Sequence, residues 1–141
     1  MYKIDFNNPI HIHFIGIGGI SMSGLAKILL SKGFTISGSD SHSSALTDEL
    51  IGDGCLVSVP QSASNITNDI DLVVYTAAIH PDNPEFKAAK EAGLPMLTRA
   101  ELLGQIMTIY KNAINIAGTH GKTTTTSMVS EILLAASMDP T

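Results

Sequence analysis

Residues 14–24, FIGIGGISMSG, decide the fold, because a glycine-rich turn stands there between an apolar run and a helical pattern. The β-branched run Ile10–Ile15 predicts a strand, and apolar residues at helical spacing from Ile20 to Leu30 predict a helix. Glycines in such a turn allow a diphosphate to approach the backbone, and the start of the helix adds unpaired N–H groups. Ser21 stands where the dinucleotide-binding fingerprint has its third glycine. A purely structural tight turn therefore remains the alternative.

The same alternation of strand and helix continues along the chain, and it predicts a parallel sheet with helices on both faces. Residues 1–110 are thus expected to form a Rossmann-like, doubly wound α/β domain, whose ligands bind at the edge where the strands end. Further strands are expected at 34–38, 55–59, 71–76 and 95–98, and further helices at 45–51, 84–92 and 100–110.

Residues 117–125, AGTHGKTTT, form a second glycine loop. We expect a strand at 112–117 before it and a helix at 125–137 after it. Lys122 in this setting reaches the β- and γ-phosphates of ATP, and the Thr123 hydroxyl can bind Mg²⁺. His120 either contacts a phosphate or only shapes the loop. A polar turn with a helix cap does not explain both the lysine and the glycines, so the loop predicts ATP binding.

Residues 111–141 are expected to be the first strand–loop–helix unit of a truncated ATP-binding domain, since one strand and one helix cannot bury a core. We expect this segment to fray or to pack on a neighbouring molecule. The net charge of −5, with only 8 Lys and Arg residues, argues against nucleic-acid binding. No signal peptide and no apolar run of membrane-spanning length is visible, which predicts a cytoplasmic protein. The single cysteine, Cys55, is expected in the core.

Three more polar residues have two interpretations each. Asp40 ends the second expected strand, where an acid binds a ribose hydroxyl in dinucleotide-binding folds, or it caps the next helix. His11 and His13 alternate with apolar residues and are expected on one face of the first strand. Their spacing permits metal binding, but no acidic or Cys partner stands nearby in the sequence, which favours a structural role.

Several short motifs resemble those of the Mur ligases over nearly the whole chain. They are the first loop, the stretches Gly38-Ser39-Asp40, Thr76-Ala77-Ala78-Ile79, Asp82-Asn83-Pro84-Glu85 and Arg99-Ala100-Glu101, and the shortened Gly-x-x-Gly-Lys-Thr of the second loop. The family often has two serines where this chain has Thr76 and Ala77.

The resemblance implies a ligase of peptidoglycan synthesis that joins L-alanine to UDP-N-acetylmuramate through an acyl phosphate, with ATP and Mg²⁺. It places a UDP-sugar site in the first domain and an ATP site in the second, and it implies that this chain alone does not turn over. The implied UDP-sugar site comprises Gly16, Gly18, Gly19, Ser21, Met22, Ser23, Gly24, Ser39, Asp40, Ala78 and Arg99. The implied ATP site comprises Gly118, Thr119, His120, Gly121, Lys122, Thr123 and Thr124, with Lys122 as the catalytic residue and Thr123 as the metal ligand.

Three rival functions share part of this pattern. A murein-peptide ligase of the same family differs in its first loop. An NAD(P)-binding oxidoreductase domain shares the first loop and Asp40, but it does not predict the second loop. A nucleotide-sensing module, which is not an enzyme, would bind the same ligands.

Overall fold

The computed structural model describes residues 1–140, and they divide into two compact units. The first unit is Met1–Ile109, and the second begins at Tyr110. Among residues 1–140, no helix is both long enough and apolar enough to cross a bilayer.

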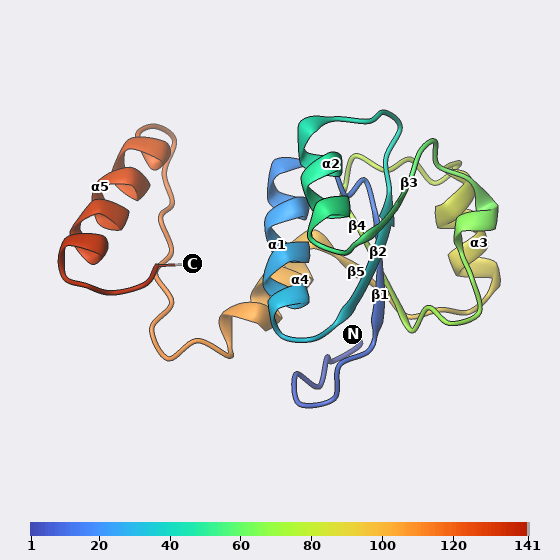
Figure 1. Cartoon of the computed structure of the whole chain (residues 1–141), viewed down its shortest axis with the longest axis horizontal. Helices are drawn as coiled ribbons and strands as arrows, with labels where there is room; N and C mark the ends of the chain where they lie inside the picture. Colours follow the sequence, from blue (N-terminus) through green and yellow to red (C-terminus); the bar gives the residue numbers. More distant parts are fainter. Residues whose placement is uncertain (141) are drawn as a thin grey trace. The chain divides into compact units, whose positions relative to one another are not determined.

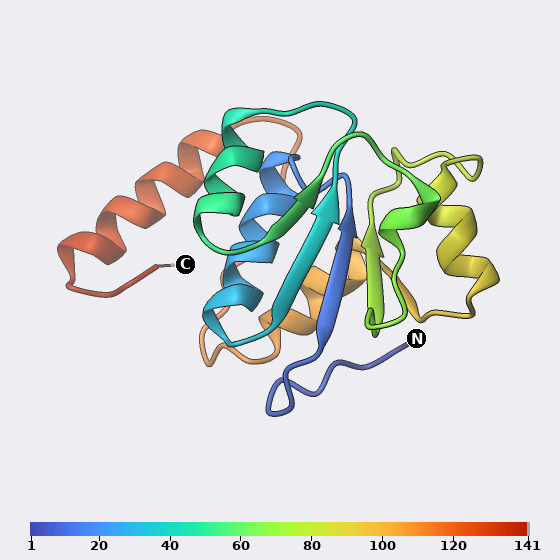
Figure 2. The same cartoon turned by 45° about the vertical axis from the view of Figure 1, so that its right-hand side comes forward.

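The first unit is built on a parallel sheet of five strands in the order β3-β2-β1-β4-β5 (Figures 1 and 2). β1 lies in the centre, and both of its neighbours run parallel to it, so the predicted doubly wound α/β fold is confirmed. The elements in chain order are β1 (His11–Ile15), α1 (Ile20–Ser31), β2 (Thr35–Ser39), α2 (Ala45–Gly52), β3 (Leu56–Ser58), the 3-10 turn η1 (Ala63–Asn65), β4 (Leu72–Tyr75), α3 (Pro84–Glu91), β5 (Met96–Thr98) and α4 (Arg99–Met107).

Helices cover both faces of this sheet: α1, α2 and α4 lie on one side and α3 on the other (Figure 1). On the α3 face, Ile15 and Val73 pack with Ala89 and Phe86 in an apolar cluster. Side chains alternate along a strand, so Ile12 and Phe14 point to the opposite face, and both are fully buried there. His11 and His13 share the α3 face with Ile15, as the sequence predicted.

Local capping explains where several helices begin. The Ser44 side chain accepts from Thr47 N at the start of α2, and Thr98 and Glu101 form a reciprocal capping box at the start of α4. Asn83 caps α3, and Pro84 occupies its first turn, where a missing N–H costs nothing. The start of α1 differs, because its cap residue is a glycine without a capping side chain.

The second unit contains the helix α5 (Lys122–Ala135). The strand expected at 112–117 does not form within the described residues, so that prediction is wrong. A strand is defined by hydrogen bonds to a neighbour, and the described part of this unit offers no second strand to pair with. The helix begins three residues before the expected Thr125, because Gly121 with φ 74° already ends the loop.

Candidate nucleotide-binding site

The glycine loop after β1 is held by hydrogen bonds to one backbone carbonyl, that of Ser39 at the end of β2. Gly16 N donates to Ser39 O at 2.8 Å, and Ile17 N donates to the same oxygen at 2.9 Å. Gly16 has φ 85°, a conformation that glycine adopts without strain. The chain therefore turns sharply out of the sheet and enters α1 directly.

The first turn of α1 is open to a ligand. Gly19 is the N-cap and provides no side-chain hydrogen bond. Ser21 is exposed, and Ile20 is 86% exposed. The first N–H groups of a helix have no partner inside the helix, and they carry partial positive charge. This end of α1 can therefore hold an anion such as a diphosphate.

Asp40 contacts the loop directly. Its Oδ2 accepts from Gly18 N at 2.9 Å, and its Oδ1 accepts from Ser41 N at 2.8 Å. A Cβ at Gly18 would lie 2.8 Å from Oδ2 of Asp40, so a side chain at this position would displace the carboxylate. The alternative that Asp40 caps the following helix is wrong, because Ser44 caps α2.

Loops after β4 and β5 reach the same edge of the sheet. Arg99, the first residue of α4, donates from Nη1 to Ser21 Oγ at 2.9 Å. Ile79 lies beside Gly16, since a Cβ on that glycine would be 3.8 Å from Ile79 Cδ1. Ala78 is exposed in the same turn, where its N–H donates to Thr76 Oγ1 at 3.3 Å. The carboxyl ends of four strands thus surround the glycine loop.

Three side chains of the expected site point away from solvent. Met22 is 1% exposed and packs in the core. Ser23 is also buried, and its hydroxyl donates to Ile20 O at 3.0 Å within the helix. Ser39 is fully buried, and its hydroxyl donates to a Glu85 carboxylate oxygen. Gly24 is exposed on α1.

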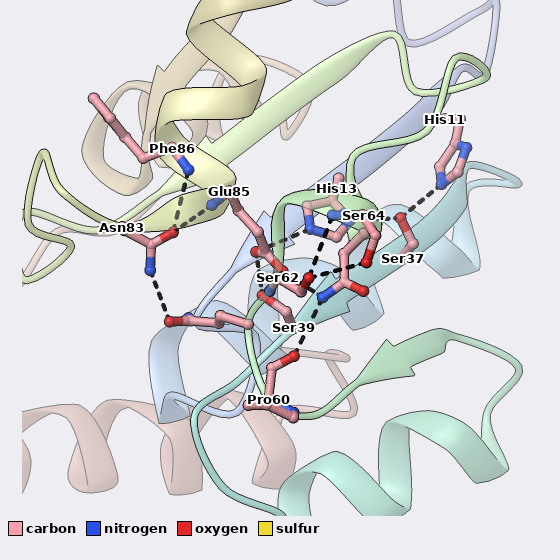
Figure 3. A network of polar contacts seen from close by, with 12 residues as sticks. His11, His13, Ser37, Ser39, Pro60, Ser62, Ser64, Asn83, Glu85 and Phe86 are labelled. Carbon is pink, nitrogen blue, oxygen red and sulfur yellow. Dashed lines mark hydrogen bonds and ion pairs between the residues drawn. The ribbon is translucent and has the colours of Figure 1, made fainter.

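Beneath the loop, on the α3 face, lies a buried polar network that the sequence did not reveal (Figure 3). The Ser37 hydroxyl sits between two histidine rings, 2.7 Å from His11 Nε2 and 2.9 Å from His13 Nδ1. His11 Nδ1 lies 2.9 Å from Asp69 Oδ2, and His13 Nε2 lies 3.4 Å from Glu85 Oε2. Both carboxylates come from distant parts of the sequence, so the lack of an acidic neighbour in the sequence did not reveal them.

Glu85 is the one buried carboxylate among the described residues. Besides Ser39 and His13, it accepts from Asn65 Nδ2 at 2.6 Å and from Ser62 N at 3.2 Å. Burial by itself raises the pKa of this carboxyl. Hydrogen bonds from His13, Ser39 and Asn65 outweigh burial and hold the pKa below its ordinary value. Glu85 is therefore ionised at neutral pH.

The loop before α5 forms a second set of exposed backbone groups. Its cap residue, Gly121, offers no side-chain hydrogen bond, so the first N–H groups of α5 are free for phosphate. Lys122 Nζ donates to Gly118 O at 2.6 Å, across the loop. All seven residues expected to bind ATP are exposed.

The fit to Mg²⁺ is partial. Thr123 supplies a neutral hydroxyl, and no group of three His, Cys, Asp or Glu side chains suited to a metal occurs among residues 1–140. Mg²⁺ is usually held by one or two carboxylates together with phosphate oxygens and water. Thr123 alone is therefore an incomplete metal site.

Comparison with known proteins gives relatives along the whole chain. A UDP-N-acetylmuramate–L-alanine ligase of Lachnospira eligens is 97% identical over 141 residues, and one of Agathobacter rectalis is 74% identical over the same length. In both cases the match covers 100% of this chain and 31% of the relative, so the chain spans about a third of their length.

Solved structures similar to this chain also come from ligases. A UDP-N-acetylmuramate–alanine ligase of Thermotoga maritima is 38% identical with a TM-score of 0.82, covering 88% of this chain and 29% of that chain. A murein peptide ligase of Psychrobacter arcticus is 30% identical with a TM-score of 0.84, covering 91% and 27%. The family model for the catalytic domain of the Mur ligase family matches residues 11–111. Because that match covers more than half of the sequence, this chain belongs to the Mur ligase family.

Proposed function

We propose that this chain is the UDP-N-acetylmuramate-binding part of a ligase that joins L-alanine to that nucleotide in peptidoglycan synthesis. The observation that carries the proposal is the glycine loop at the carboxyl edge of the sheet, with an uncapped helix behind it. The relative from Lachnospira eligens, 97% identical over the whole chain, bears the name of that activity.

The ligand's diphosphate fits the open first turn of α1. The backbone N–H groups of Ile20 to Met22 have no partner inside the helix, and Arg99 adds a positive charge held 2.9 Å from Ser21 Oγ. The net charge of the chain is −5, so this local arrangement, and not the overall charge, attracts the anion.

The second unit, from about residue 111, is proposed to begin an ATP-binding domain. ATP would supply the phosphoryl group that turns the lactyl carboxylate into an acyl phosphate, which the amine of L-alanine then attacks. Lys122 would place its ammonium group against the phosphates, and Thr123 would contribute one oxygen to Mg²⁺. Because that metal site is incomplete in residues 1–140, we expect the chain alone to bind nucleotide without turnover.

Murein-peptide ligase activity is the alternative within the family, since one solved structure of that activity is also similar to this chain. The two activities share UDP-N-acetylmuramate and differ in the amine that is joined. The high identity to named L-alanine ligases favours L-alanine.

Calorimetric titration of the chain with UDP-N-acetylmuramate tests the nucleotide assignment, with NADH as the competing ligand. We expect binding of the UDP sugar and none of NADH. Saturable binding of NADH together with no heat from the UDP sugar would favour the oxidoreductase alternative instead.

We also propose that the second unit self-associates with another copy of this chain. Its exposed apolar side chains include Ile114 and Ile132, 61% and 66% exposed, and Met128 and Leu134 on α5. Sedimentation over a range of concentrations is expected to show a dimer that Ile132→Gln weakens. A monomer at all concentrations would contradict this.

A further inference from the structure

The polar network under the glycine loop contains a continuous connection from α3 to the loop's backbone. Glu85, on α3, accepts a hydrogen bond from the Ser39 hydroxyl. The carbonyl of the same Ser39 accepts from Gly16 N and Ile17 N, the two amides that turn the chain out of β1. Ser39 and Glu85 are both fully buried. Figure 3 shows the Glu85 carboxylate directed at Ser39, with His13 beside it.

We propose that Glu85 is a positioning residue for the diphosphate loop and that it acts through Ser39. This inference rests on the proposed UDP-sugar function and assigns two residues of that site a role without ligand contact. It replaces the expectation that Ser39 touches the ligand, since the Ser39 side chain is fully buried and hydrogen-bonded to Glu85.

The chemistry of the carboxylate suits this task. Four donors reach Glu85: two on Oε2, from Ser39 and His13, and two on Oε1, from Asn65 and Ser62 N. An ionised carboxylate accepts all four, and hydrogen bonds to a charged group are stronger than those between neutral groups. Asn65 and Ser62 belong to the segment around η1, and Ser39 and His13 to the sheet. The carboxylate therefore connects the end of β2 to the segment around η1 on the α3 face of the sheet.

The position of Ser39 matters because the backbone alone sets the direction of the loop's peptide N–H groups. A shift of the Ser39 carbonyl moves Gly16 and Ile17, and Asp40, the next residue, holds Gly18 N at 2.9 Å. Small displacements of hydrogen-bonding groups have large effects on the binding of a rigid anion. Glu85 thus sets the geometry of the site without meeting the ligand.

Two variants break the connection, and a third serves as the matched control. Ser39→Ala removes the donor to Glu85 and keeps the backbone carbonyl. Glu85→Gln keeps the volume but puts an NH₂ group against donors. Ser31→Ala removes an exposed hydroxyl that donates to Ile28 O and belongs neither to the network nor to the loop.

The first readout needs no ligand: hydrogen exchange of the Gly16 and Ile17 amides in the free chain. We expect both amides to exchange faster in Ser39→Ala and Glu85→Gln and at an unchanged rate in Ser31→Ala, with each variant measured at the same interval below its own melting temperature. Unchanged exchange in Ser39→Ala would overturn the inference, even if Glu85→Gln failed to fold.

The second readout is the Kd for UDP-N-acetylmuramate. We expect it to rise about tenfold in Ser39→Ala and Glu85→Gln, as for the loss of one hydrogen bond to a charged group, and to stay within about twofold in Ser31→Ala. Equal affinity of the wild type and Ser39→Ala would overturn the inference and leave the proposed function standing. No binding by the wild type would refute the proposed function, and the exchange rates would still decide the role of Glu85.

Discussion

The carboxylate of Asp40 accepts a hydrogen bond from the peptide N–H of Gly18 at 2.9 Å. An acid at the end of the second strand thus serves the glycine loop itself. The contact joins β2 to the loop after β1, and it explains why position 18 has no side chain, since a Cβ there would lie 2.8 Å from the carboxylate oxygen. This contact therefore holds the glycine loop against the end of β2.

Removal of this contact is expected to loosen the loop. In Asp40→Ala, Gly18 N loses a charged acceptor worth about 1.5–3 kcal/mol. We predict faster hydrogen exchange of the Gly18 amide and about tenfold weaker binding of UDP-N-acetylmuramate. Asp40→Asn keeps a neutral acceptor, so its exchange rate and its affinity for the nucleotide should lie between those of the wild type and Asp40→Ala. If Asp40→Ala bound the nucleotide more tightly than the wild type, the carboxylate would be a competitor of the diphosphate and not a support of the loop.

Gly18→Ala should be far more harmful than an alanine at an exposed glycine such as Gly104. The new Cβ would meet Asp40 Oδ2 at 2.8 Å and Thr47 Cγ2 at 3.1 Å. We predict loss of nucleotide binding, measured by calorimetry. The matched control is Gly104→Ala in α4, where a Cβ meets nothing within 4 Å. There the helix should gain roughly 0.5–1 kcal/mol with binding unchanged. Equal effects of the two variants would contradict the close approach of Asp40 to the loop.

Low pH should reduce the free energy of unfolding of the first unit, because Glu85 becomes protonated. Its pKa lies below the ordinary value of 4.5, because hydrogen bonds to the charged form outweigh burial. A lowered pKa stabilises the fold above the unfolded-state value, and that contribution is lost as pH falls through the folded-state value. Glu85→Gln should therefore cost about 1–3 kcal/mol at pH 7, and the difference should shrink as the pH falls below the ordinary value of 4.5. Denaturant unfolding at several pH values measures it; a pH-independent difference would contradict an ionised Glu85.

Ser37→Ala tests the histidine part of the network. The variant leaves His11 Nε2 and His13 Nδ1 buried without their shared partner. An unsatisfied buried polar group costs about 1–3 kcal/mol, so we predict a loss of unfolding free energy in that range. Ser31→Ala is the control, because its exposed hydroxyl bonds only to Ile28 O, and it should change stability by less than about 0.5 kcal/mol. A neutral Ser37→Ala would mean that the rings find other partners.

The sheet of the first unit was predictable from the sequence because its strands and helices follow simple patterns. The apolar run at β4 indicates a buried strand, and the glycines after α1 and α3 indicate helix ends. Both signals depend only on residues that are close together in the sequence. The strand expected at 112–117 was wrong because pairing depends on a partner that the pattern cannot supply. The turn before α5 was predictable from Gly118 and Gly121, and ATP binding by this loop stays a prediction.

The network under the loop was not predictable in the same way. Glu85 reaches Ser39 across 46 residues, and His11 reaches Asp69 across 58. Such contacts depend on the order of strands in the sheet, which sequence spacing does not reveal. The motif Asn83-Pro84-Glu85 was visible, but its glutamate looked like an ordinary residue of the first helical turn. The two buried histidines were the one available signal, because buried polar groups need partners.

We propose that the backbone around residues 16–24 binds the diphosphate of UDP-N-acetylmuramate. Titration of the ¹⁵N-labelled chain with this nucleotide, followed by amide chemical shifts, tests it most directly. We predict that the largest shifts occur at Gly16, Gly18, Gly19 and Ser21, and that ATP does not reproduce them. No shift in these amides at millimolar nucleotide, or shifts confined to other parts of the first unit, would contradict the account.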